Sequence, residues 1–253
     1  MWVSDTRGDD NGDGGYDDPY QTIQYGINNA QNVTGNVYYV LVEYETYYEH
    51  IVFPDRRTDD RAIKLKGLNS GGMPNGDKPI VDAGSGEHRS YSVFKLYYVS
   101  DGTLVDNFLI REGYASRGSA IGGGMYIRSS SATTITNCEF YSNEANNGGG
   151  LFIEACSPSI QNCVFKSNKA WTKGGAIYTT LCQSLISGCD IGYSSANSAP
   201  NSSSSSAEIY TYTEYVPTYQ DCGIRGATYS NGKVYGSYCD YSHTPPIDGG
   251  DNY

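Results

Sequence analysis

The chain has 253 residues, a formal net charge of −11 at pH 7 and only 38% hydrophobic residues. Nucleic-acid phosphates require clusters of Lys and Arg, so this acidic composition excludes nucleic acid as a partner. No apolar run approaches the roughly 20 residues that cross a bilayer, so we expect no membrane span. The 31 glycines argue against a thick globular core and favour a narrow, stacked one.

Residues 1–35 predict a short strand, an acidic loop and a capping helix. Ile23, Ile27 and Ala30 follow one another at positions i, i+4 and i+7, which gives one apolar stripe on a short helix. Such a helix can lie across the first coil of a stack of strands and cover its open edge. A free amphipathic helix is the alternative.

The acidic loop has the pattern Asp9-x-Asn11-x-Asp13-Gly14, which matches the first half of a calcium loop. Oxygen ligands at alternate positions can converge on a hard cation. Position twelve of such a loop is Tyr20 here instead of Glu, which favours a plain polar turn. Calcium is the one cofactor that the sequence offers, with Asp9, Asn11 and Asp13 as its ligands, and both interpretations stay open.

A repeat of about 26 residues dominates the stretch from residue 122 to residue 191. A Gly-rich motif begins at Gly122, Gly148 and Gly174, and an Ile-x-(Asn/Gly)-Cys motif begins at Ile135, Ile160 and Ile186. Both contain alternating apolar residues flanked by Asn, Ser and Gly, which is typical of strands and turns. We therefore predict an all-β, parallel β-helix over residues 36–193, with coils roughly 4.8 Å apart. The Leu-x-x-Leu-x-Leu frame of a leucine-rich repeat, the alternative solenoid, is missing.

Segments of the chain also resemble a known superfamily. The segments that carry the resemblance are Val3-Ser4, Asn11–Gly14, Pro19–Ala30, Thr46–Ile51, Ile63–Gly67, Ile80–Ala83 and Val105–Ile110. They are similar to an uncharacterised bacterial domain that opens right-handed parallel β-helix proteins of the pectate-lyase-like superfamily. The later repeats resemble those of polymorphic outer-membrane adhesins. The resemblance implies a right-handed coil and leaves function open, because this superfamily mixes lyases, hydrolases, adhesins and structural proteins.

The C-terminal part departs from the repeat. Residues 194–207 are rich in Ser and Asn, which indicates a flexible linker or an exposed insertion. Residues 208–253 are rich in Tyr, and Ile209–Val216 alternates like a strand. This Tyr-rich extension could form final coils, a cap or a strand exchanged with a neighbouring molecule.

The cysteines fall into two ladders and a remainder. One ladder comprises Cys138, Cys163 and Cys189, the other comprises Cys156 and Cys182, and Cys222 and Cys239 lie outside both. Stacked residues have parallel Cβ vectors, which give a poor disulfide torsion, so the ladders are expected to be buried free thiols. Cys222–Cys239 is the disulfide candidate, provided that the compartment is oxidising. Zinc is not expected, because no Cys-x-x-Cys pair occurs.

Modification patterns lie at both ends of the chain. Asn32 and Asn201 begin acceptor sequons for N-glycosylation, and Ser202, Ser203 and Ser204 open a serine run that could accept O-glycans.

Asn143 and Asn168 follow the cysteine motifs at a matching position. Their functional interpretation is contact with a glycan, and their structural one, which we favour, is an internal ladder of amides bonded between coils.

The repeat does not collect the groups that an enzyme needs. It aligns Arg128 with Glu154 and Thr180, and Glu139 with Val164 and Asp190, so neither column pairs like carboxylates for glycoside hydrolysis. Arg111, Arg117 and Arg128 are candidate bases for a lyase, but each is more simply the cation of a solvated ion pair. No catalytic residue is therefore assigned.

These observations favour an extracellular or cell-surface, non-enzymatic protein with a structural or adhesive role. The chain is acidic, low in Lys and rich in Ser, Thr, Asn and Tyr. This composition is typical of extracellular proteins. No second capping helix follows Ile191, and an exposed strand edge is a template for another chain. We therefore expect end-to-end self-association into a fibre. The alternatives are a polysaccharide lyase or glycosidase, and a β-helix that binds glycans without cleaving them.

Overall fold

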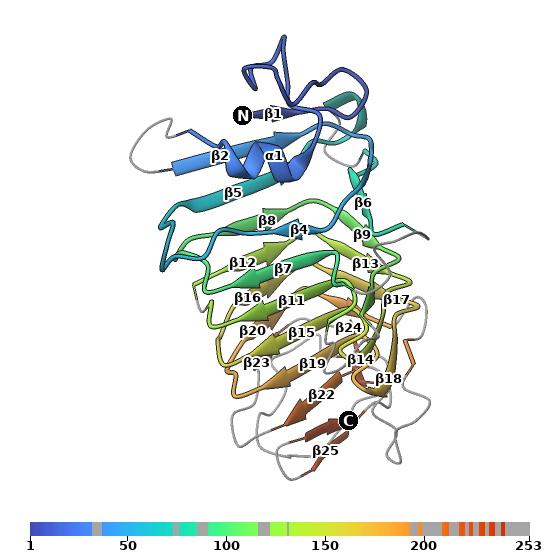
Figure 1. Cartoon of the computed structure of the whole chain (residues 1–253). Helices are drawn as coiled ribbons and strands as arrows, with labels where there is room; N and C mark the ends of the chain where they lie inside the picture. Colours follow the sequence, from blue (N-terminus) through green and yellow to red (C-terminus); the bar gives the residue numbers. More distant parts are fainter. Residues whose placement is uncertain are drawn as a thin grey trace.

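The computed structural model describes residues 1–31, 37–72, 76–84, 91–115, 122–130, 132–192 and 197–198, and six short stretches between residues 209 and 240 that correspond to the strands β22 to β27. Over these residues the chain is a right-handed parallel β-helix, as the sequence predicts. Figure 1 shows the coils stacked from the N-terminal end to the C-terminal end.

Three long sheets form the sides of the coil, and their strands are parallel except for the last strand of sheet B. Sheet A contains β1 (Trp2–Val3), β2 (Val37–Val42), β5 (Ala62–Gly67), β8 (Leu104–Asp106), β12 (Thr134–Thr136), β16 (Ser159–Gln161), β20 (Leu185–Ser187) and β23 (Thr218–Gln220). Sheet B contains β3 (Thr46–Tyr48), β6 (Ile80–Asp82), β9 (Leu109–Arg111), β13 (Glu139–Tyr141), β17 (Val164–Lys166), β21 (Asp190–Ile191), β24 (Gly223–Ile224) and β27 (Cys239–Asp240). Sheet C contains β4 (Ile51–Val52), β7 (Phe94–Tyr97), β11 (Met125–Arg128), β15 (Leu151–Glu154), β19 (Ile177–Thr180) and β22 (Ile209–Tyr212).

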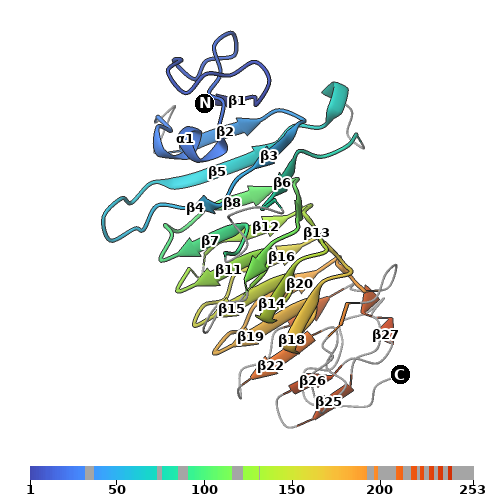
Figure 2. The same cartoon turned by 45° about the vertical axis from the view of Figure 1, so that its right-hand side comes forward.

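Smaller elements complete the structure. A three-stranded sheet D contains β10 (Tyr114–Ala115), β14 (Glu144–Asn147) and β18 (Lys169–Lys173), and lies beside the coil between sheets B and C (Figure 2). The short hairpin β25 (Thr228–Ser230) and β26 (Lys233–Tyr235) lies near the C-terminal end. The helices are α1 (Ile23–Asn28) and the 3₁₀ turn η1 (Ser70–Gly72).

The predicted ladders are in register. Ile135 pairs with Ile160 and Ile160 with Ile186, while Phe140 pairs with Phe165 and Phe165 with Ile191. All of these side chains are fully buried. The rings of Phe140 and Phe165 stack with their centroids 4.6 Å apart and nearly parallel, which is the spacing of neighbouring strands.

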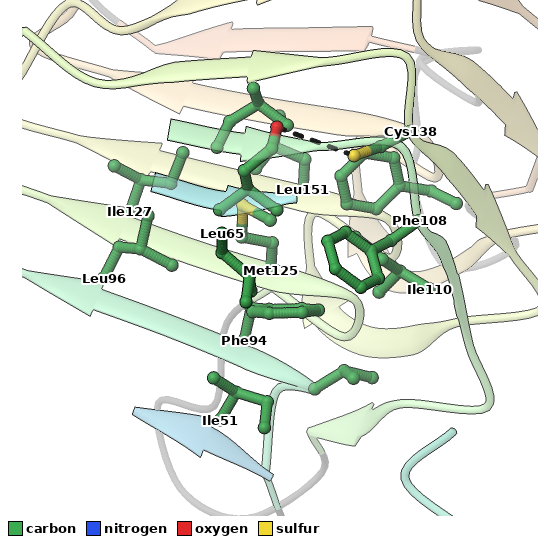
Figure 3. Packing of buried hydrophobic residues seen from close by; sticks show 14 of the residues in the cluster. Ile51, Leu65, Phe94, Leu96, Phe108, Ile110, Met125, Ile127, Cys138 and Leu151 are labelled. Carbon is green, nitrogen blue, oxygen red and sulfur yellow. Dashed lines mark hydrogen bonds between the residues drawn. The ribbon is translucent and has the colours of Figure 1, made fainter. Parts of the chain in front are cut away.

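Earlier coils fill the same narrow core with larger side chains. Figure 3 shows Phe94 and Phe108 packed beside Met125, and Cys138 lying next to Phe108. The Phe94 and Phe108 ring centroids are 6.2 Å apart. At the position after the corner between sheets A and B, the buried residue thus changes from Phe108 to a thiol, Cys138, Cys163 and Cys189, in the following coils.

The turn from sheet A to sheet B explains why the repeat motif contains an Asn before its Cys. Asn107, Asn137 and Asn162 each follow a strand of sheet A and adopt a left-handed backbone with φ between 50° and 67°, and Gly188 takes the same place one coil later. Asn and Gly are the residues that tolerate this conformation best. The motif therefore specifies the corner between sheets A and B.

The Gly-rich motif forms another corner. Gly148 is left-handed, with φ 63°, and a Cβ on the following Gly149 would lie 2.5 Å from the carbonyl oxygens of both Gly175 and Lys169. Only glycine permits this close approach of two coils. These segments are therefore corners at which neighbouring coils approach closely.

The expected Asn ladder is present and has a third member. Asn143, Asn168 and Asn197 are buried, and each side-chain amide donates to a main-chain carbonyl of the preceding coil, at 2.9–3.1 Å. The Asn168 Oδ1 atom accepts from Asn143, and Asn197 Oδ1 accepts from Asn168. Asn197, together with Ser198, lies within the interval that composition assigned to a linker or insertion, yet it belongs to the coil.

The two cysteine ladders are buried and free, as predicted. Cys138, Cys156, Cys163, Cys182 and Cys189 form no disulfide. Each thiol donates to a main-chain carbonyl, for example Cys163 to Gln161 O at 3.2 Å. Burial and neighbouring thiols raise the pKa of Cys163 far above its ordinary value, so its thiol stays protonated.

The predicted capping helix covers the first coil. Ile23, Gly26 and Ile27 face inward, and a Cβ on Gly26 would lie 2.7 Å from Val3. The Gln24 amide donates to Val52 O at 3.0 Å and accepts from Val52 N at 2.7 Å, so it closes the free edge of β4. Helix α1 therefore satisfies the backbone that sheet C would otherwise expose.

The C-terminal segment extends the stack within the same chain. Strands β22, β23 and β24 pair in parallel with β19, β20 and β21, and β27 pairs antiparallel with β24. Ile209 of β22 is fully buried. Of the three possibilities for this extension, its described strands form final coils, and they cover the edge that follows Ile191.

Candidate functional site

The outer side of sheet B, which we call the B face, carries two columns of side chains. In one column the register aligns Thr46, Ile80, Leu109, Glu139, Val164 and Asp190; in the other it aligns Tyr48, Asp82, Arg111, Tyr141 and Lys166. The residues between them point into the core. Strand alternation therefore displays both columns on one surface.

A groove of about 380 Å³ lies along the first column. Its lining residues are Tyr44, Gly76, Asp77, Lys78, Ile80, Leu109 and Glu139. One wall is the loop between β5 and β6, which Ser70 N closes by donating to Asp77 O at 3.0 Å. Lys78 Nζ anchors this wall, because it donates to Asn137 O at 2.6 Å. The groove combines apolar strand residues with charged groups from the loop.

The second column contains an arginine oriented by a buried carboxylate. Asp82 is only 5% exposed, and its Oδ2 atom accepts from Arg111 Nε at 2.7 Å. Its other oxygen accepts from Gly84 N at 2.7 Å. Because Asp82 binds Nε alone, no hydrogen-bond partner is described for the two terminal amino groups of Arg111 within the residues that the structure covers.

Exposed tyrosines flank this pair. Tyr48 is 67% exposed and Tyr141 is 40% exposed. They occupy one column three strands apart, with Asp82 and Arg111 between them, which places them about 14 Å apart along the stack. Amphipathic rings with one solvent-facing side are the side chains that proteins use to contact partners that are partly apolar.

Charges on the B face are largely paired. Glu139 accepts from Lys166 at 3.3 Å. Glu112 lies at the corner after Arg111, where desolvation and the nearby Asp82 carboxylate raise its pKa despite the opposing effect of Arg111. The face thus offers both hydrogen-bond donors and acceptors with little excess charge.

The outer side of sheet C is a second candidate, and it is filled by its own side chains. Tyr126 is buried, donates to Glu154, and packs edge-on against Tyr97 and Phe152. Burial and these hydrogen bonds raise the pKa of Tyr126 well above its ordinary value. The Nε atom of Arg128 lies 3.7 Å from the Oε2 atom of Glu154. The side chains of this face are therefore bound to one another.

The columns expected from the repeat have the expected register. Arg128 aligns with Glu154 and Thr180, and Glu139 with Val164 and Asp190. Of the candidate bases, Arg111 and Arg128 are held in ion pairs, and Arg117 lies outside the described residues.

The acidic loop has the geometry of a polar turn. Asp9 Oδ1 accepts from the main chain and the side chain of Asn11 at 2.9 and 2.8 Å, which lowers the pKa of Asp9. Asp13 Oδ1 accepts from Gly15 N at 2.7 Å. Within the described part of the chain, no cluster of three or more His, Cys, Asp or Glu side chains is arranged to hold a metal ion. Calcium at Asp9, Asn11 and Asp13 stays a prediction.

The remaining predicted sites lie outside the described residues. These are Asn32, Asn201, Ser202, Ser203 and Ser204 for glycosylation, and Cys222 for the disulfide with Cys239, whose strand is described but whose side chain is not. Likewise, no described helix combines the length and apolarity needed to cross a bilayer.

Sequence reasoning named Arg111 and Glu139 but missed the other residues that build the groove and the row on the B face. Tyr44, Asp77 and Lys78 lie in unrepeated connections, and Asp82 meets Arg111 only through the β6–β9 register. The one available signal was the excess of tyrosine, 25 residues in all, without any indication of where they gather.

The coil and its polar, tyrosine-bearing sheet define a β-solenoid protein with one open, grooved side. Residues 96–249 match the family model described as "Right handed beta helix region", so the chain belongs to that family. No curated protein matches the sequence.

Two solved structures resemble the chain. A pectin methylesterase in complex with hexasaccharide VII has 12% sequence identity and a TM-score of 0.37, with 92% of this chain and 73% of that chain covered. The pectin methylesterase PemA from Erwinia chrysanthemi has 12% identity and a TM-score of 0.36, with 94% and 74% covered. At these TM-scores neither structure bears on the activity of this chain.

Proposed function

We propose that this protein is an extracellular, non-enzymatic adhesive β-helix that binds a glycan chain along its B face. The observation that carries the proposal is a groove that runs beside a row of outward side chains, Tyr48, Asp82, Arg111 and Tyr141, with an exposed tyrosine at each end. Ile80 and Asp82, Leu109 and Arg111, and Glu139 and Tyr141 are pairs two residues apart, so each strand contributes to both. An extended ligand lying across the strands would contact both at once.

The chemistry of this surface suits a sugar. A pyranose ring has apolar C–H faces that pack on aromatic rings, and hydroxyl groups that both donate and accept hydrogen bonds. Tyr48 and Tyr141 offer rings, Arg111 and Lys78 offer donors, and Glu139 offers an acceptor. Composition supports the extracellular location, where such polymers are abundant.

The engagement of two central B-face carboxylates, Asp82 and Glu139, supports binding without cleavage. Glycoside hydrolysis needs one carboxyl group free to protonate the leaving oxygen and a second to act as base or nucleophile. Asp82 is bound to Arg111 and Gly84 N, and Glu139 is paired with Lys166. Neither is free to play such a role.

Binding to a panel of immobilised glycans tests the proposal, with Tyr141→Ala as the variant. Tyr39→Ala is the matched control, because Tyr39 is 39% exposed on a strand of sheet A and remote from the groove. We expect saturable binding that Tyr141→Ala weakens by roughly tenfold, about the contribution of one stacked ring. Equal effects of the two variants would contradict a site on the B face.

The same panel tests the enzyme alternative. Release of unsaturated or reducing sugar by the purified protein would overturn the non-enzymatic assignment. Detection of the protein only inside the producing cells would overturn the extracellular one.

End-to-end self-association remains a separate expectation. Its physical motive was an open edge after Ile191, which β22, β23 and β24 occupy within the chain. Sedimentation at high protein concentration tests it, and a single monomeric species would exclude the fibre.

A further inference from the structure

The B face carries both signs of charge, with carboxylates in slight excess. Its cations are Lys78, Arg111 and Lys166, and its carboxylates are Asp77, Asp82, Glu112, Glu139 and Asp190. The cations are also engaged: Lys78 with Asn137 O, Arg111 with Asp82, and Lys166 with Glu139. A polyanionic ligand would therefore meet little attraction here, on a chain whose net charge is already −11.

Arg111 nevertheless keeps part of its donor capacity. Asp82 accepts only from the Nε atom of Arg111. The two terminal amino groups of the guanidinium therefore remain a planar pair of N–H donors for a ligand bound on the B face. The pairing with a buried carboxylate fixes the plane of the guanidinium and offsets its charge at the same time. A fixed, charge-balanced fork is suited to two neighbouring hydroxyl oxygens of one sugar ring, with Tyr48 and Tyr141 placed to contact rings on either side.

We propose, building on the proposed function, that the row Tyr48–Arg111–Tyr141 selects neutral glycans over polyuronates. Arg111 donates to a pair of adjacent hydroxyls, and Asp82 is a positioning residue that orients Arg111 and cancels its charge. The selectivity follows from this cancellation, because an unpaired arginine in the same place would favour a carboxylate-bearing sugar.

The test compares a neutral β-glucan oligosaccharide with an oligouronate of the same length. We expect the wild-type protein to prefer the neutral ligand, with an affinity that changes less than about twofold between low and physiological salt. Arg111→Lys keeps the charge and removes the fork, and we expect it to weaken neutral binding roughly tenfold. Tyr39→Ala serves again as the control.

Asp82→Asn separates positioning from a purely structural role. This variant keeps the volume and the acceptor for Gly84 N, but it releases the charge of Arg111. We expect the ratio of oligouronate to neutral affinity to rise about tenfold, a change that a loss of fold would not produce. Circular dichroism and urea unfolding of the same sample establish that the coil is intact.

Each outcome separates the two proposals. Preference for the oligouronate with a steep loss of affinity in salt would overturn the selectivity and leave glycan binding standing. Neutral binding that Arg111→Lys and Asp82→Asn both leave unchanged would overturn the assignment to this row. Absence of binding to either ligand class, and to every other glycan of the panel, would overturn the proposed function itself.

Discussion

Replacement of Asn168 by Ala is expected to destabilise the coil more than any change on its surface. Asn168 is the middle member of the Asn ladder. Its amide nitrogen donates to Phe140 O and to Asn197 Oδ1, both at 2.9 Å, and its oxygen accepts from Asn143 N and Asn143 Nδ2 at 3.1 and 3.0 Å. Truncation removes all four bonds from a site without exposure to water.

The magnitude follows from what is left behind. A buried hydrogen bond contributes about 1 kcal/mol net, and an orphaned buried group costs about 1–3 kcal/mol. Asn143 N–H is left without a partner and three further bonds are lost, so the total loss is about 4 kcal/mol. That is a large part of the roughly 5–15 kcal/mol by which domains are stable. Asn168→Asp retains the volume, but it loses the donor and buries a charge, so it should destabilise at least as much at neutral pH.

Urea unfolding followed by circular dichroism measures the change in the free energy of unfolding at constant m-value. Gln161→Ala is the control, since Gln161 lies on the outer side of sheet A and donates only to Ser159 Oγ. We expect the control to stay within about 0.5 kcal/mol of the wild type. A loss below about 1 kcal/mol for Asn168→Ala would refute the reasoning, because it would mean that water or relaxed neighbours replace the ladder.

Three further changes test other parts of the coil. Burial raises the pKa of Glu49, which accepts from Ile23 N and Gln24 N at the start of α1, to about 7. A raised carboxyl pKa adds stability below the unfolded value of about 4.5 that is lost as pH rises through 7. Wild-type stability should therefore fall by about 2.5 kcal/mol between pH 5 and 8, and Glu49→Gln should show a flatter profile; equal profiles of the two proteins would refute this. Gly149→Ala should destabilise by several times the roughly 1 kcal/mol expected for Gly71→Ala, because a Cβ at Gly71 meets nothing within 4 Å and suffers only backbone strain; similar thermal midpoints for the two variants would contradict the close approach of coils. Iodoacetamide should label Cys163 only in denaturant, as mass spectrometry of its peptide would show; labelling of the native protein would mean that the core opens locally.

The inner residues of the coil could be predicted from the sequence because the fold repeats them. Ile135, Phe140 and Asn168 each have a counterpart one coil away, and a period that survives in the sequence must survive in the stack. Asn197 escaped prediction because the coil that leads to it is longer, so its spacing from Asn168 breaks the period. Asn197 plays the same role in the ladder as Asn168, and only the number of residues that separates it from the preceding Asn differs.

The B face could not be predicted in the same way. Asp82 and Arg111 become neighbours through a strand pairing, and the neighbouring strands of the described column carry Tyr48, Tyr141 and Lys166 at that position. Lys78 and Asp77 reach the groove from a loop that occurs once. Outward positions are free of the packing constraints that keep inward ones alike, so the sequence carries no periodic signal for them. From the sequence we expected contacts at the ends of the stack, through end-to-end association, whereas the function that we propose uses the side formed by sheet B.

The register of the coils has a consequence for how such a protein could change over generations. Each coil holds its neighbours through the same inward residues, corner residues and backbone bonds, as Phe140 and Phe165 illustrate by stacking at 4.6 Å. Duplication of a genetic segment encoding one coil would therefore insert a ready-made layer, with no new core to invent. Outward positions on the new layer would then be free to diverge. A lineage could lengthen or rewrite its B face one layer at a time while the interior stayed constant.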